Sequence, residues 1–188
     1  MRDKVKIPNT GRMKWDMFEE KPLRKGTFVE IEGDLLKMSQ QGKFDFIGHG
    51  CNCFATMGAG IALPIGIMYP EAKIADKNFV APSYMRLGNF SIGLVHVNRR
   101  AKSFDILRIV NFYSQYHGGP NLDKEALILS LRKFATFRRV SSFFNEDQYR
   151  IGLPIIGCGI AGGNWNTVKK IIAKELKEFD VTIVHFKE

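Results

Sequence analysis

Strand-like and helix-like segments alternate along most of this chain, and this alternation is the feature that most constrains its fold. Strand candidates, in which apolar residues alternate or run continuously, occupy residues 27–32, 44–49, 91–98, 105–113, 149–156 and 181–186. Helix candidates, which have apolar stripes or end at helix-breaking residues, occupy residues 60–69, 71–79, 122–138 and 164–179. Asn121 and Asn164 are the expected N-caps of the last two. Strands that alternate with helices in this way predict an α/β sandwich around a mostly parallel sheet.

The length and composition fit one globular domain preceded by an arm. The chain has 188 residues, of which 45% are hydrophobic and 25% are charged, and these fractions exclude a disordered or collagen-like protein. Residues 1–26 mix charged residues, prolines and glycines without periodicity, whereas the regular pattern begins at Thr27. We therefore expect an N-terminal arm or extension over residues 1–26 and a single domain over residues 27–188.

The three cysteines, Cys51, Cys53 and Cys158, predict a reducing compartment rather than a disulfide framework. Their number is odd, and the first two are too close in sequence to bridge each other easily. The N-terminal segment lacks the apolar stretch of a secretory signal, and no apolar run has the length of a membrane span. We therefore expect a cytoplasmic protein with no membrane partner. A C-x-C pair with one remote cysteine is a poor zinc site, so we expect cysteines that fill turns, no metal and no cofactor.

The chain is basic, with 28 lysines and arginines against 19 aspartates and glutamates and a formal net charge of +9. Such an excess favours an anionic partner without identifying it. The basic residues that a nucleic acid would contact are Arg99, Arg100, Lys102, Arg132, Lys133, Arg138 and Arg139. The last four also lie near the end of a helix candidate, where they complement the helix dipole. Because no RNA- or DNA-binding motif accompanies them, a nucleic acid is not an expected partner.

Two glycine-rich segments follow strand candidates and precede helix candidates. The first covers residues 49–62, HGCNCFATMGAGIA, and the second covers residues 157–163, GCGIAGG. Glycine lets the backbone approach a ligand, and N–H groups near a helix start attract anions. Either segment alone is equally compatible with a tight strand-to-helix connection. Two of them at the edge of one sheet, where ligands collect, predict a pocket for a ligand with more than one phosphate. Neither is a P-loop, so a metal-dependent NTPase is not expected.

Taken in order, the motifs of this chain resemble those of the macrodomain family. The resemblance covers about residues 27–186 and rests on Gly33-Asp-Leu-Leu36, His49-Gly-Cys-Asn-Cys53, Met57-Gly-Ala-Gly-Ile-Ala62, Tyr69-Pro-Glu-Ala72 and Pro154-Ile-Ile-Gly-Cys-Gly-Ile-Ala-Gly162. Within the family, the H-x-C-N-C and Y-P-x-A segments are similar to those of the ADP-ribose-1″-phosphate phosphatase branch. The resemblance implies that residues 27–188 form a macrodomain, a three-layer α/β/α sandwich with a mixed, mostly parallel central sheet. It also implies an ADP-ribose pocket that needs no metal or cofactor.

The resemblance assigns binding roles to particular residues. Asp34, beside Leu35, would accept a hydrogen bond from the adenine amino group, although an aspartate there is also a good N-cap for a short helix. Asn52 would contact the distal ribose, and an aromatic side chain of the last strand, His185 or Phe186, would pack on adenine. The two loops would hold the phosphates and the distal ribose through Gly58, Ala59, Gly60, Ile61, Gly157, Cys158, Gly159, Ile160, Ala161 and Gly162.

His49 is the predicted catalytic residue. It is the one side chain of these motifs that exchanges a proton near neutral pH, and the matching histidine of the phosphatase branch is thought to be catalytic. It would activate a water or protonate the departing ribose oxygen while loop amides hold the phosphate. The alternative is a buried histidine that only fixes the loop. His117 is a second candidate, and Gln115 or Tyr116 could equally reach the distal ribose.

The expected function is hydrolysis of ADP-ribose 1″-phosphate to ADP-ribose. The first alternative is a non-catalytic reader of ADP-ribose or of ADP-ribosylated proteins, which shares nearly every pocket residue and differs through His49. The second alternative is an ADP-ribosyl hydrolase, although the branch that cleaves ADP-ribose from protein carboxylates carries an aspartate where this chain has Ala161. The expected partner is therefore a small molecule, ADP-ribose or its 1″-phosphate, or else an ADP-ribosylated protein.

Overall fold

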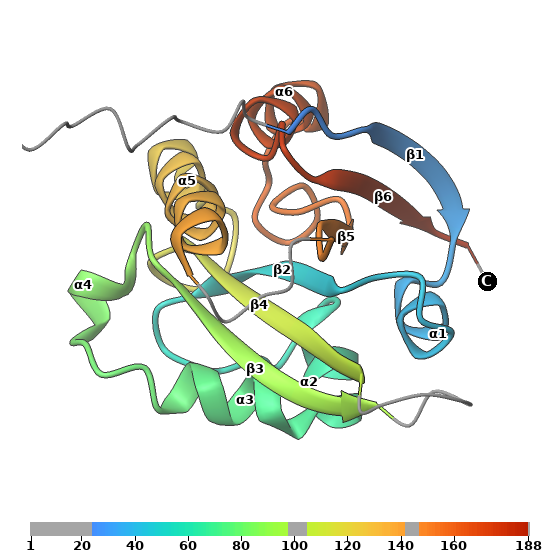
Figure 1. Ribbon diagram of the computed structural model, residues 1–188. Coiled ribbons are helices and arrows are strands. Elements are labelled where there is room, and N and C mark those ends of the chain that lie inside the picture. The colour runs from blue at the N-terminus through green and yellow to red at the C-terminus, as the bar shows by residue number, and fades with distance from the viewer. Residues whose placement is uncertain (1–23, 98–104, 142–146, 188) are drawn as a thin grey trace, which may run out of the picture.

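The computed structural model describes residues 24–97, 105–141 and 147–187, which form a six-stranded sheet with helices on both faces (Figure 1). The strands are β1 (Phe28–Gly33), β2 (Phe46–Asn52), β3 (Phe90–Val97), β4 (Asp105–Gln115), β5 (Arg150–Leu153) and β6 (Asp180–Phe186). The helices are α1 (Leu35–Gln40), α2 (Ala62–Met68), α3 (Pro70–Lys77), α4 (Ser83–Arg86), α5 (Lys124–Val140) and α6 (Trp165–Glu175).

The strand order of the sheet is β1-β6-β5-β2-β4-β3. Every neighbouring pair is parallel except β3 and β4, which are antiparallel. The predicted α/β sandwich with a mixed, mostly parallel sheet is therefore confirmed. Because β2 and β5 are parallel neighbours, their carboxyl ends meet at one edge of the sheet, and the two glycine-rich segments that follow them start there.

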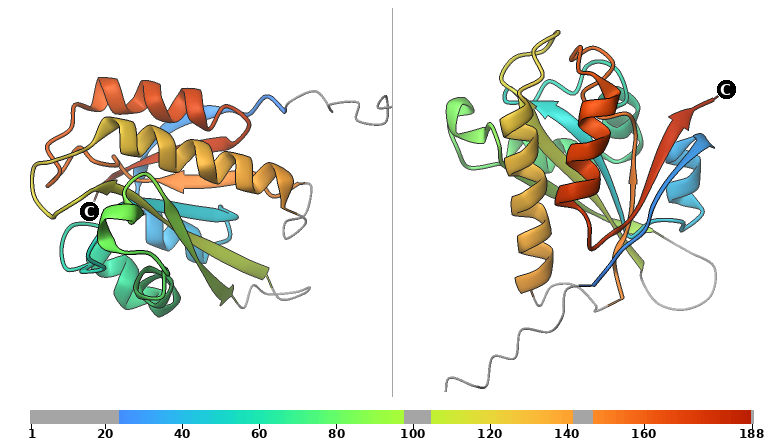
Figure 2. Two further views of the ribbon diagram at one scale, coloured as in Figure 1. Left: turned by 90° about the vertical axis from the view of Figure 1, so that its left-hand side faces the viewer. Right: turned by 90° about the horizontal axis from the view of Figure 1, so that it is seen from above.

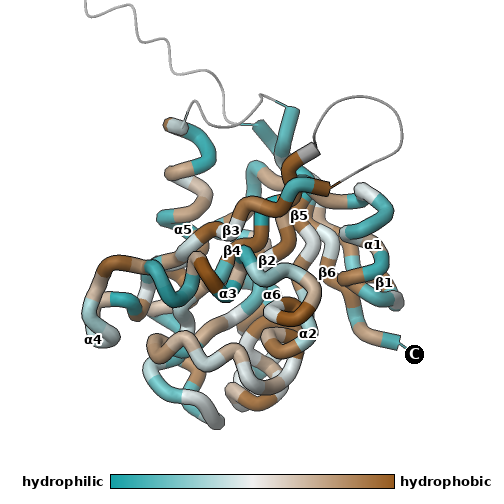
Figure 3. Tube along the Cα trace, turned by 90° about the horizontal axis from the view of Figure 1, so that it is seen from below, coloured by the Kyte–Doolittle hydropathy of each residue, from teal (hydrophilic) through white to brown (hydrophobic). Residues whose placement is uncertain are grey.

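The helices form two layers that cover opposite faces of the sheet (Figure 2). Helices α5 and α6 pack on one face through residues such as Leu131, Phe134 and Ile172. Helices α1, α2 and α3 cover the other face, where Leu35 and Ile65 join the second apolar core. Hydrophobic residues concentrate on the strands between these layers, whereas α5 alternates between hydrophilic and hydrophobic residues (Figure 3). This pattern is expected for strands covered on both faces and for amphipathic helices.

Local sequence signals explain where most helices begin. Asn164 caps α6 by accepting from the backbone N–H of Thr167, as predicted. Pro70 is the first residue of α3, so it separates two helical segments, as expected for a residue without an N–H. Helix α5 is capped by Asp123, which accepts from Ala126, and not by Asn121 as the sequence suggested. Helices α1 and α4 were not expected as separate elements from apolar periodicity, because they are only one or two turns long.

The predicted N-terminal arm, residues 1–26, lies almost entirely outside the described residues. Its last residues run beside the connection from α6 to β6, where the Gly26 N–H donates to the Lys177 carbonyl at 2.8 Å and Arg24 pairs with Asp180. Regular structure begins at Phe28. Within the described part of the chain, no helix is both long and apolar enough to cross a membrane.

Candidate functional site

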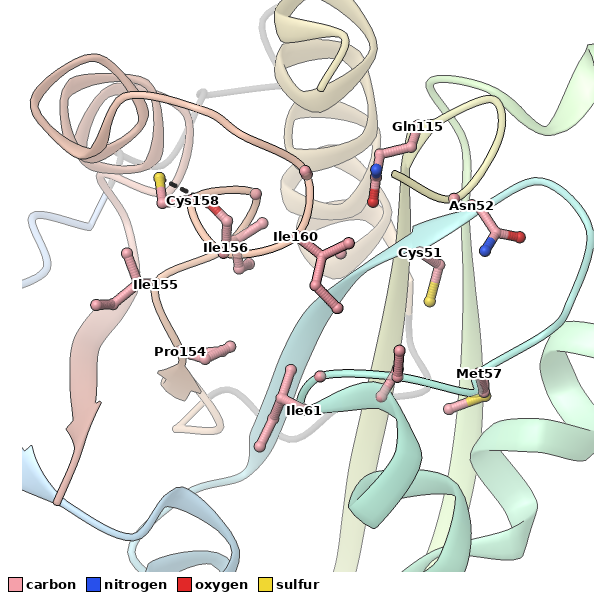
Figure 4. A pocket seen from close by; sticks show the side chains of 18 of the residues that line it. Cys51, Asn52, Met57, Ile61, Gln115, Pro154, Ile155, Ile156, Cys158 and Ile160 are labelled. Atoms are coloured by element: carbon pink, nitrogen blue, oxygen red, sulfur yellow. Dashed lines mark hydrogen bonds between the residues drawn. The ribbon is translucent and has the colours of Figure 1, made fainter. Parts of the chain in front are cut away.

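A cleft of about 510 Å³ lies at the carboxyl edge of the sheet, between the two glycine-rich loops (Figure 4). The first loop, residues 53–61, joins β2 to α2, and the second loop, residues 154–164, joins β5 to α6. The loops approach each other closely, because a Cβ placed on Gly60 would lie 3.6 Å from Cδ1 of Ile160. The remaining wall comes from the end of β4, from β6 and from Asp76 of α3. The two loops therefore face each other across a real cavity.

The first loop is shaped by Asn52, the last residue of β2. The Phe54 N–H donates to Asn52 Oδ1 at 2.9 Å, and Asn52 Nδ2 donates to Thr56 Oγ1 at 2.7 Å. Asn52 lines the cleft, as predicted for a ribose contact, but these bonds already hold its amide within the loop. Cleft-lining residues of this loop whose backbone N–H groups have no acceptor in the described part of the chain include Gly58, Ala59, Gly60 and Ile61.

The second loop turns at Gly157, where a side chain would not fit. Its φ of 70° lies in the left-handed region, and a Cβ would approach Leu122 Cδ1 to 2.8 Å. The Gly163 N–H donates to the Gly157 carbonyl at 2.8 Å and closes the turn. Gly162 belongs to this turn and does not line the cleft, so its ligand contact stays a prediction. Cleft-lining residues of this loop whose N–H groups have no acceptor among the described residues are Gly157, Gly159, Ile160 and Ala161.

Few ionisable side chains line the cleft. Among the residues described, its wall contains one carboxyl group, that of Asp76, and two thiols, those of Cys51 and Cys158, but no lysine, arginine or histidine. An anionic ligand would therefore be held mainly by backbone N–H groups of the two loops. Such groups are fixed dipoles that need no side-chain ordering to bind phosphate oxygens.

His49, the predicted catalytic residue, lies in β2 and outside the lining of the cleft. Its side chain is fully buried on the face that α2 and α3 cover, with Nε2 2.7 Å from Asn111 Oδ1. Burial lowers its pKa to about 4, so the ring is neutral at neutral pH. It does not line the cleft. The geometry therefore favours the alternative interpretation, a buried histidine that fixes the strand end.

Asp34 and Leu35 lie at the carboxyl end of β1, beside the cleft and not in its wall. Asp34 Oδ1 caps α1 by accepting from the backbone N–H groups of Leu36 and Lys37 at 2.9 and 3.0 Å. Leu35 is buried in the apolar core. The residue before Asp34 pairs with Phe186, which does line the cleft. The structure thus puts Asp34 next to the β6 end of the cleft, with one carboxylate oxygen engaged in helix capping.

Successive residues of β6 point to opposite faces, and this separates the two aromatic candidates. His185 faces away from the cleft, with Nε2 2.8 Å from Glu30 Oε2. Hydrogen bonds from Lys169, His185 and Trp165 lower the pKa of Glu30 to about 2. Phe186 lines the cleft and is 70% exposed. The residue positioned to pack on a ligand is therefore Phe186 and not His185.

Two further sequence candidates lie around the mouth of the cleft. His117 does not line it, and its ring stacks on Phe54 with centroids 4.9 Å apart. Gln115 does line it, and its Nε2 donates to the Gly119 carbonyl at 2.7 Å. Of these two residues, only Gln115 is placed to contact a bound ligand without a movement of the segment that follows β4.

The cysteines occupy buried or half-buried positions around the strand ends. Burial raises the pKa of Cys51 well above its ordinary value and that of Cys53 to about 11, so both thiols are protonated at neutral pH. In the described ranges, no group of three histidine, cysteine, aspartate or glutamate side chains is arranged to hold a metal ion.

Two basic residues of α5, Arg132 and Arg139, pair with acidic side chains. Arg132 makes two hydrogen bonds of 2.9 Å to Glu175, and Arg139 pairs with Glu178 at 2.6 Å. The basic turn at residues 99–102 lies outside the described residues.

Sequence analysis missed Asp76. This residue lies in α3 beyond the Tyr69-Pro-Glu-Ala72 motif, and the packing of α3 against β3 and β4 brings it to the cleft. No local pattern distinguishes it from the other charged residues of α3.

The fold of this chain is that of the macrodomains. The macrodomain of Mycobacterium tuberculosis DarG is 21% identical, with a TM-score of 0.61, and the match covers 85% of this chain and 97% of that chain. Thermosipho africanus DarTG, solved in complex with ADP-ribose, is 16% identical with a TM-score of 0.65, and the match covers 86% of this chain and 43% of that chain. The resemblance to macrodomains is thus confirmed by the structure.

Sequence comparison identifies relatives in a bacteriophage and a yeast, while no family model matches the chain. The uncharacterized 17.5 kDa protein in the tk–vs intergenic region of phage T4 is 31% identical over 158 residues, which are 82% of this chain and 93% of that protein. The ADP-ribose 1″-phosphate phosphatase of Saccharomyces cerevisiae is 22% identical over 174 residues, which are 81% of this chain and 95% of that protein. The chain belongs to the same family as the phage protein.

Proposed function

We propose that this chain binds ADP-ribose 1″-phosphate in the cleft and hydrolyses the terminal phosphate to give ADP-ribose. One observation carries the proposal: the two loops face each other, and each has backbone N–H groups without an acceptor in the described residues. Two facing sets of such groups suit a ligand with phosphates at two places.

The comparisons and the size of the cleft support this choice of ligand. The yeast relative is named an ADP-ribose 1″-phosphate phosphatase, and the DarTG structure contains ADP-ribose. The volume of about 510 Å³ lies within the range of roughly 300–1,000 Å³ that is usual for small-molecule sites. The net charge of +9 would speed the encounter with a ligand that carries three phosphates.

In the proposed complex, backbone N–H groups make most of the phosphate contacts. The second loop wraps the diphosphate, with Cys158 and Gly162 completing its turn. The first loop holds the terminal phosphate and the distal ribose, and Asn52 shapes its start. The residues whose N–H groups contact the ligand are Gly58, Ala59, Gly60, Ile61, Gly157, Gly159, Ile160 and Ala161.

Adenine occupies the β6 end of the cleft in this arrangement. The exposed ring of Phe186 packs on its face. Asp34 lies beside Phe186, and its Oδ2, which does not cap α1 and is 3.6 Å from Lys37 Nζ, accepts a hydrogen bond from the adenine amino group. Leu35 supports this end from the core and does not touch the ligand.

The chemistry follows from the arrangement of dipoles in the cleft. As a water attacks phosphorus, charge grows on the phosphate oxygens and on the departing ribosyl oxygen. Fixed N–H groups stabilise that charge better than water does, because they need no reorganisation.

A non-catalytic reader of ADP-ribose or of ADP-ribosylated proteins is the second candidate function. The burial of His49 favours it, because that side chain was the predicted difference between an enzyme and a reader. Hydrolysis of ADP-ribosyl bonds by an acid of the second loop has no support, because the buried Ala161 occupies the corresponding position. We also propose that the protein is cytoplasmic, because three cysteines without a disulfide fit a reducing compartment.

Two measurements on the full chain test the proposal: phosphate release from ADP-ribose 1″-phosphate and calorimetric binding of ADP-ribose. Gly159→Leu is the informative variant, because a Cβ at Gly159 meets no atom within 4 Å and the larger side chain would fill the cleft. It should weaken binding by about tenfold or more, equivalent to about 1.4 kcal/mol, and Gly159→Ala should have a much smaller effect. Binding without phosphate release would select the reader, and no binding would reject both functions.

A further inference from the structure

The carboxyl group of Asp76 reaches the wall of the cleft although the residue is only 1% exposed. Its Oδ1 accepts from the Tyr113 hydroxyl at 2.9 Å and lies 3.5 Å from Arg86 Nη1. Its Oδ2 has no hydrogen-bond partner among the residues that the structure describes. Buried carboxylate oxygens are normally satisfied, so a buried Oδ2 without a partner, in a residue that lines the cleft, leaves a contact that a bound ligand can complete.

The packing of α3 against the sheet puts the carboxyl group there. Gly93 of β3 permits this packing, because a Cβ at that position would lie 2.7 Å from the backbone nitrogen of Ala72. The Ala72 carbonyl accepts from Asn111 Nδ2 at 2.9 Å, and the Asp76 carbonyl accepts from Arg86 Nη1 at 2.9 Å. The backbone of α3 is therefore held from two sides, independently of the Asp76 Oδ2 atom.

A chain of buried hydrogen bonds ends on Asp76. Its links are His49 Nε2 to Asn111 Oδ1 at 2.7 Å, Asn111 Nδ2 to Ser91 Oγ at 3.0 Å, Ser91 Oγ to Tyr113 OH at 3.0 Å, and Tyr113 OH to Asp76 Oδ1 at 2.9 Å. An amide oxygen only accepts and an amide nitrogen only donates, so every link can donate in the same direction, toward Asp76. A satisfied network of this kind holds its last member rigidly.

The surroundings favour the protonated form of the carboxyl group. Burial raises the pKa of Asp76, while the hydrogen bond from Tyr113 and the charge of Arg86 oppose the rise. The thiols of Cys51 and Cys53, on the neighbouring strand end, carry no charge at neutral pH because burial raises their pKa. A phosphate bound in the cleft raises the pKa of Asp76 further, since a nearby negative charge disfavours ionisation.

We propose that Asp76 is a catalytic residue that donates the proton on Oδ2 to the ribosyl oxygen leaving phosphorus. The inference rests on the proposed function. The water oxygen bonds to phosphorus as the bond between phosphorus and the ribosyl oxygen breaks, and the ribosyl oxygen keeps the electron pair. That oxygen takes the Asp76 proton and becomes the hydroxyl of ADP-ribose. The attacking water gives up one proton, which restores the carboxyl group, and hydrogen phosphate leaves.

The first test compares phosphate release by the wild-type chain, Asp76→Asn and Glu71→Gln. Asparagine keeps the size of the side chain and lacks the transferable proton, so kcat should fall by about 100-fold or more, within the range for general acid catalysis. The Kd for ADP-ribose, measured by calorimetry, should stay close to the wild-type value. Glu71→Gln removes a carboxylate from the same helix outside the cleft and should leave kcat unchanged.

The outcomes separate this inference from the proposed function. If the wild-type chain and Asp76→Asn release phosphate at the same rate, Asp76 is not the general acid. The proposed phosphatase activity then still stands. Binding of ADP-ribose without phosphate release by the wild-type chain overturns both.

A second variant gives a readout that a purely structural role would not move. A general acid works while protonated, so kcat of the wild-type chain should fall as pH rises through the pKa of Asp76 in the complex. Tyr113→Phe removes the hydrogen bond that lowers this pKa, so the fall should move to higher pH. A Tyr113→Phe profile that overlays the wild-type profile, or a wild-type kcat that does not fall with rising pH, contradicts the inference even if Asp76→Asn does not fold.

Discussion

The two faces of the sheet are filled in different ways, although the same strands supply both. On the face covered by α5 and α6, Phe134 contacts the rings of Phe46, Phe112 and Phe179 at centroid distances of 5.3, 5.6 and 5.3 Å. Aromatic rings in edge-to-face or offset contact bury large apolar areas and add specific ring interactions. This face contains much of the apolar core.

The face covered by α2 and α3 contains apolar residues and also the buried chain from His49 to Asp76. Polar groups are costly to bury unless they are hydrogen-bonded, and this network bonds its members up to Asp76 Oδ1. The Oδ2 atom is buried and has no partner among the described residues, and Asp76 itself belongs to the lining of the cleft. The face covered by α5 and α6 therefore mainly stabilises the fold. The face covered by α2 and α3 also contains a polar network, which is costly to bury and which ends at Asp76 in the wall of the cleft.

The largest expected effect is a loss of stability on substituting a residue of the face covered by α5 and α6. Phe134→Ala should lower the free energy of unfolding by about 3–5 kcal/mol, the usual cost of deleting a buried aromatic ring. Urea unfolding measures this loss, and calorimetry on the folded variant should give a Kd for ADP-ribose near that of the wild type. A large loss of affinity in a folded variant would mean that the two faces are not separable.

The second effect is a pH dependence that comes from His49. The folded chain protonates this ring only near pH 4, whereas an ordinary histidine does so near pH 6.5. The unfolded chain therefore binds the proton more readily, and the stabilisation is complete above pH 6.5 and declines as the pH falls toward 4. The free energy of unfolding should drop by about 3 kcal/mol across this window.

Urea unfolding of His49→Gln between pH 7 and 4.5 checks this dependence. The variant should be much less sensitive to pH than the wild type, and His117→Gln, which replaces an exposed histidine, should behave like the wild type. Equal pH sensitivity in the wild type and His49→Gln would show that the ring is not held neutral by burial.

A smaller effect is expected in the middle of the network. Asn111→Ala leaves the His49 Nε2–H without its acceptor and removes one of the hydrogen bonds of the Ser91 hydroxyl, and buried groups left unsatisfied cost about 1–3 kcal/mol. Thermal and urea unfolding measure the loss. A change close to zero would mean that water replaces the amide, and the network would then not be a rigid support for Asp76.

The smallest effect is a gain of stability on replacing Asp76. Burial raises the pKa of this carboxyl group in the folded chain, so its ionisation opposes folding at high pH and ceases to do so as the pH falls toward the unfolded value. Asp76→Asn should therefore melt at a higher temperature than the wild type at pH 8, and the difference should shrink in acid. A variant that is less stable at pH 8 would indicate a structural role for the carboxylate.

The order of strands and helices along the chain could be predicted from the sequence because the apolar patterns are long and regular. The alternation of strands and helices predicted the layers, and glycine after strand candidates predicted the two loops that face each other. Asn164 predicted the start of α6, since an N-cap is a local signal. Asp123 competed with Asn121 for the start of α5, and only the final backbone path decides between two capping residues so close together.

Side-chain direction could not be predicted with the same success. His185 leaves the sheet on the side away from the cleft, whereas His49 lies on the same face as the cleft-lining Cys51 but is buried beneath it. Strand residues alternate between faces, so the motif alone does not say which of His185 and Phe186 reaches a ligand. Asp76 lies distant in sequence from both loops and reaches the cleft through packing, which no single segment encodes.

The central claim is that main-chain amides of both loops hold the ligand, and an NMR titration of the full chain with ADP-ribose tests it most directly. The account predicts that the largest backbone amide shifts fall on residues 58–61 and 157–161, with much smaller shifts along α5. Shifts confined to one loop, or a titration that leaves both loops unmoved, would contradict it.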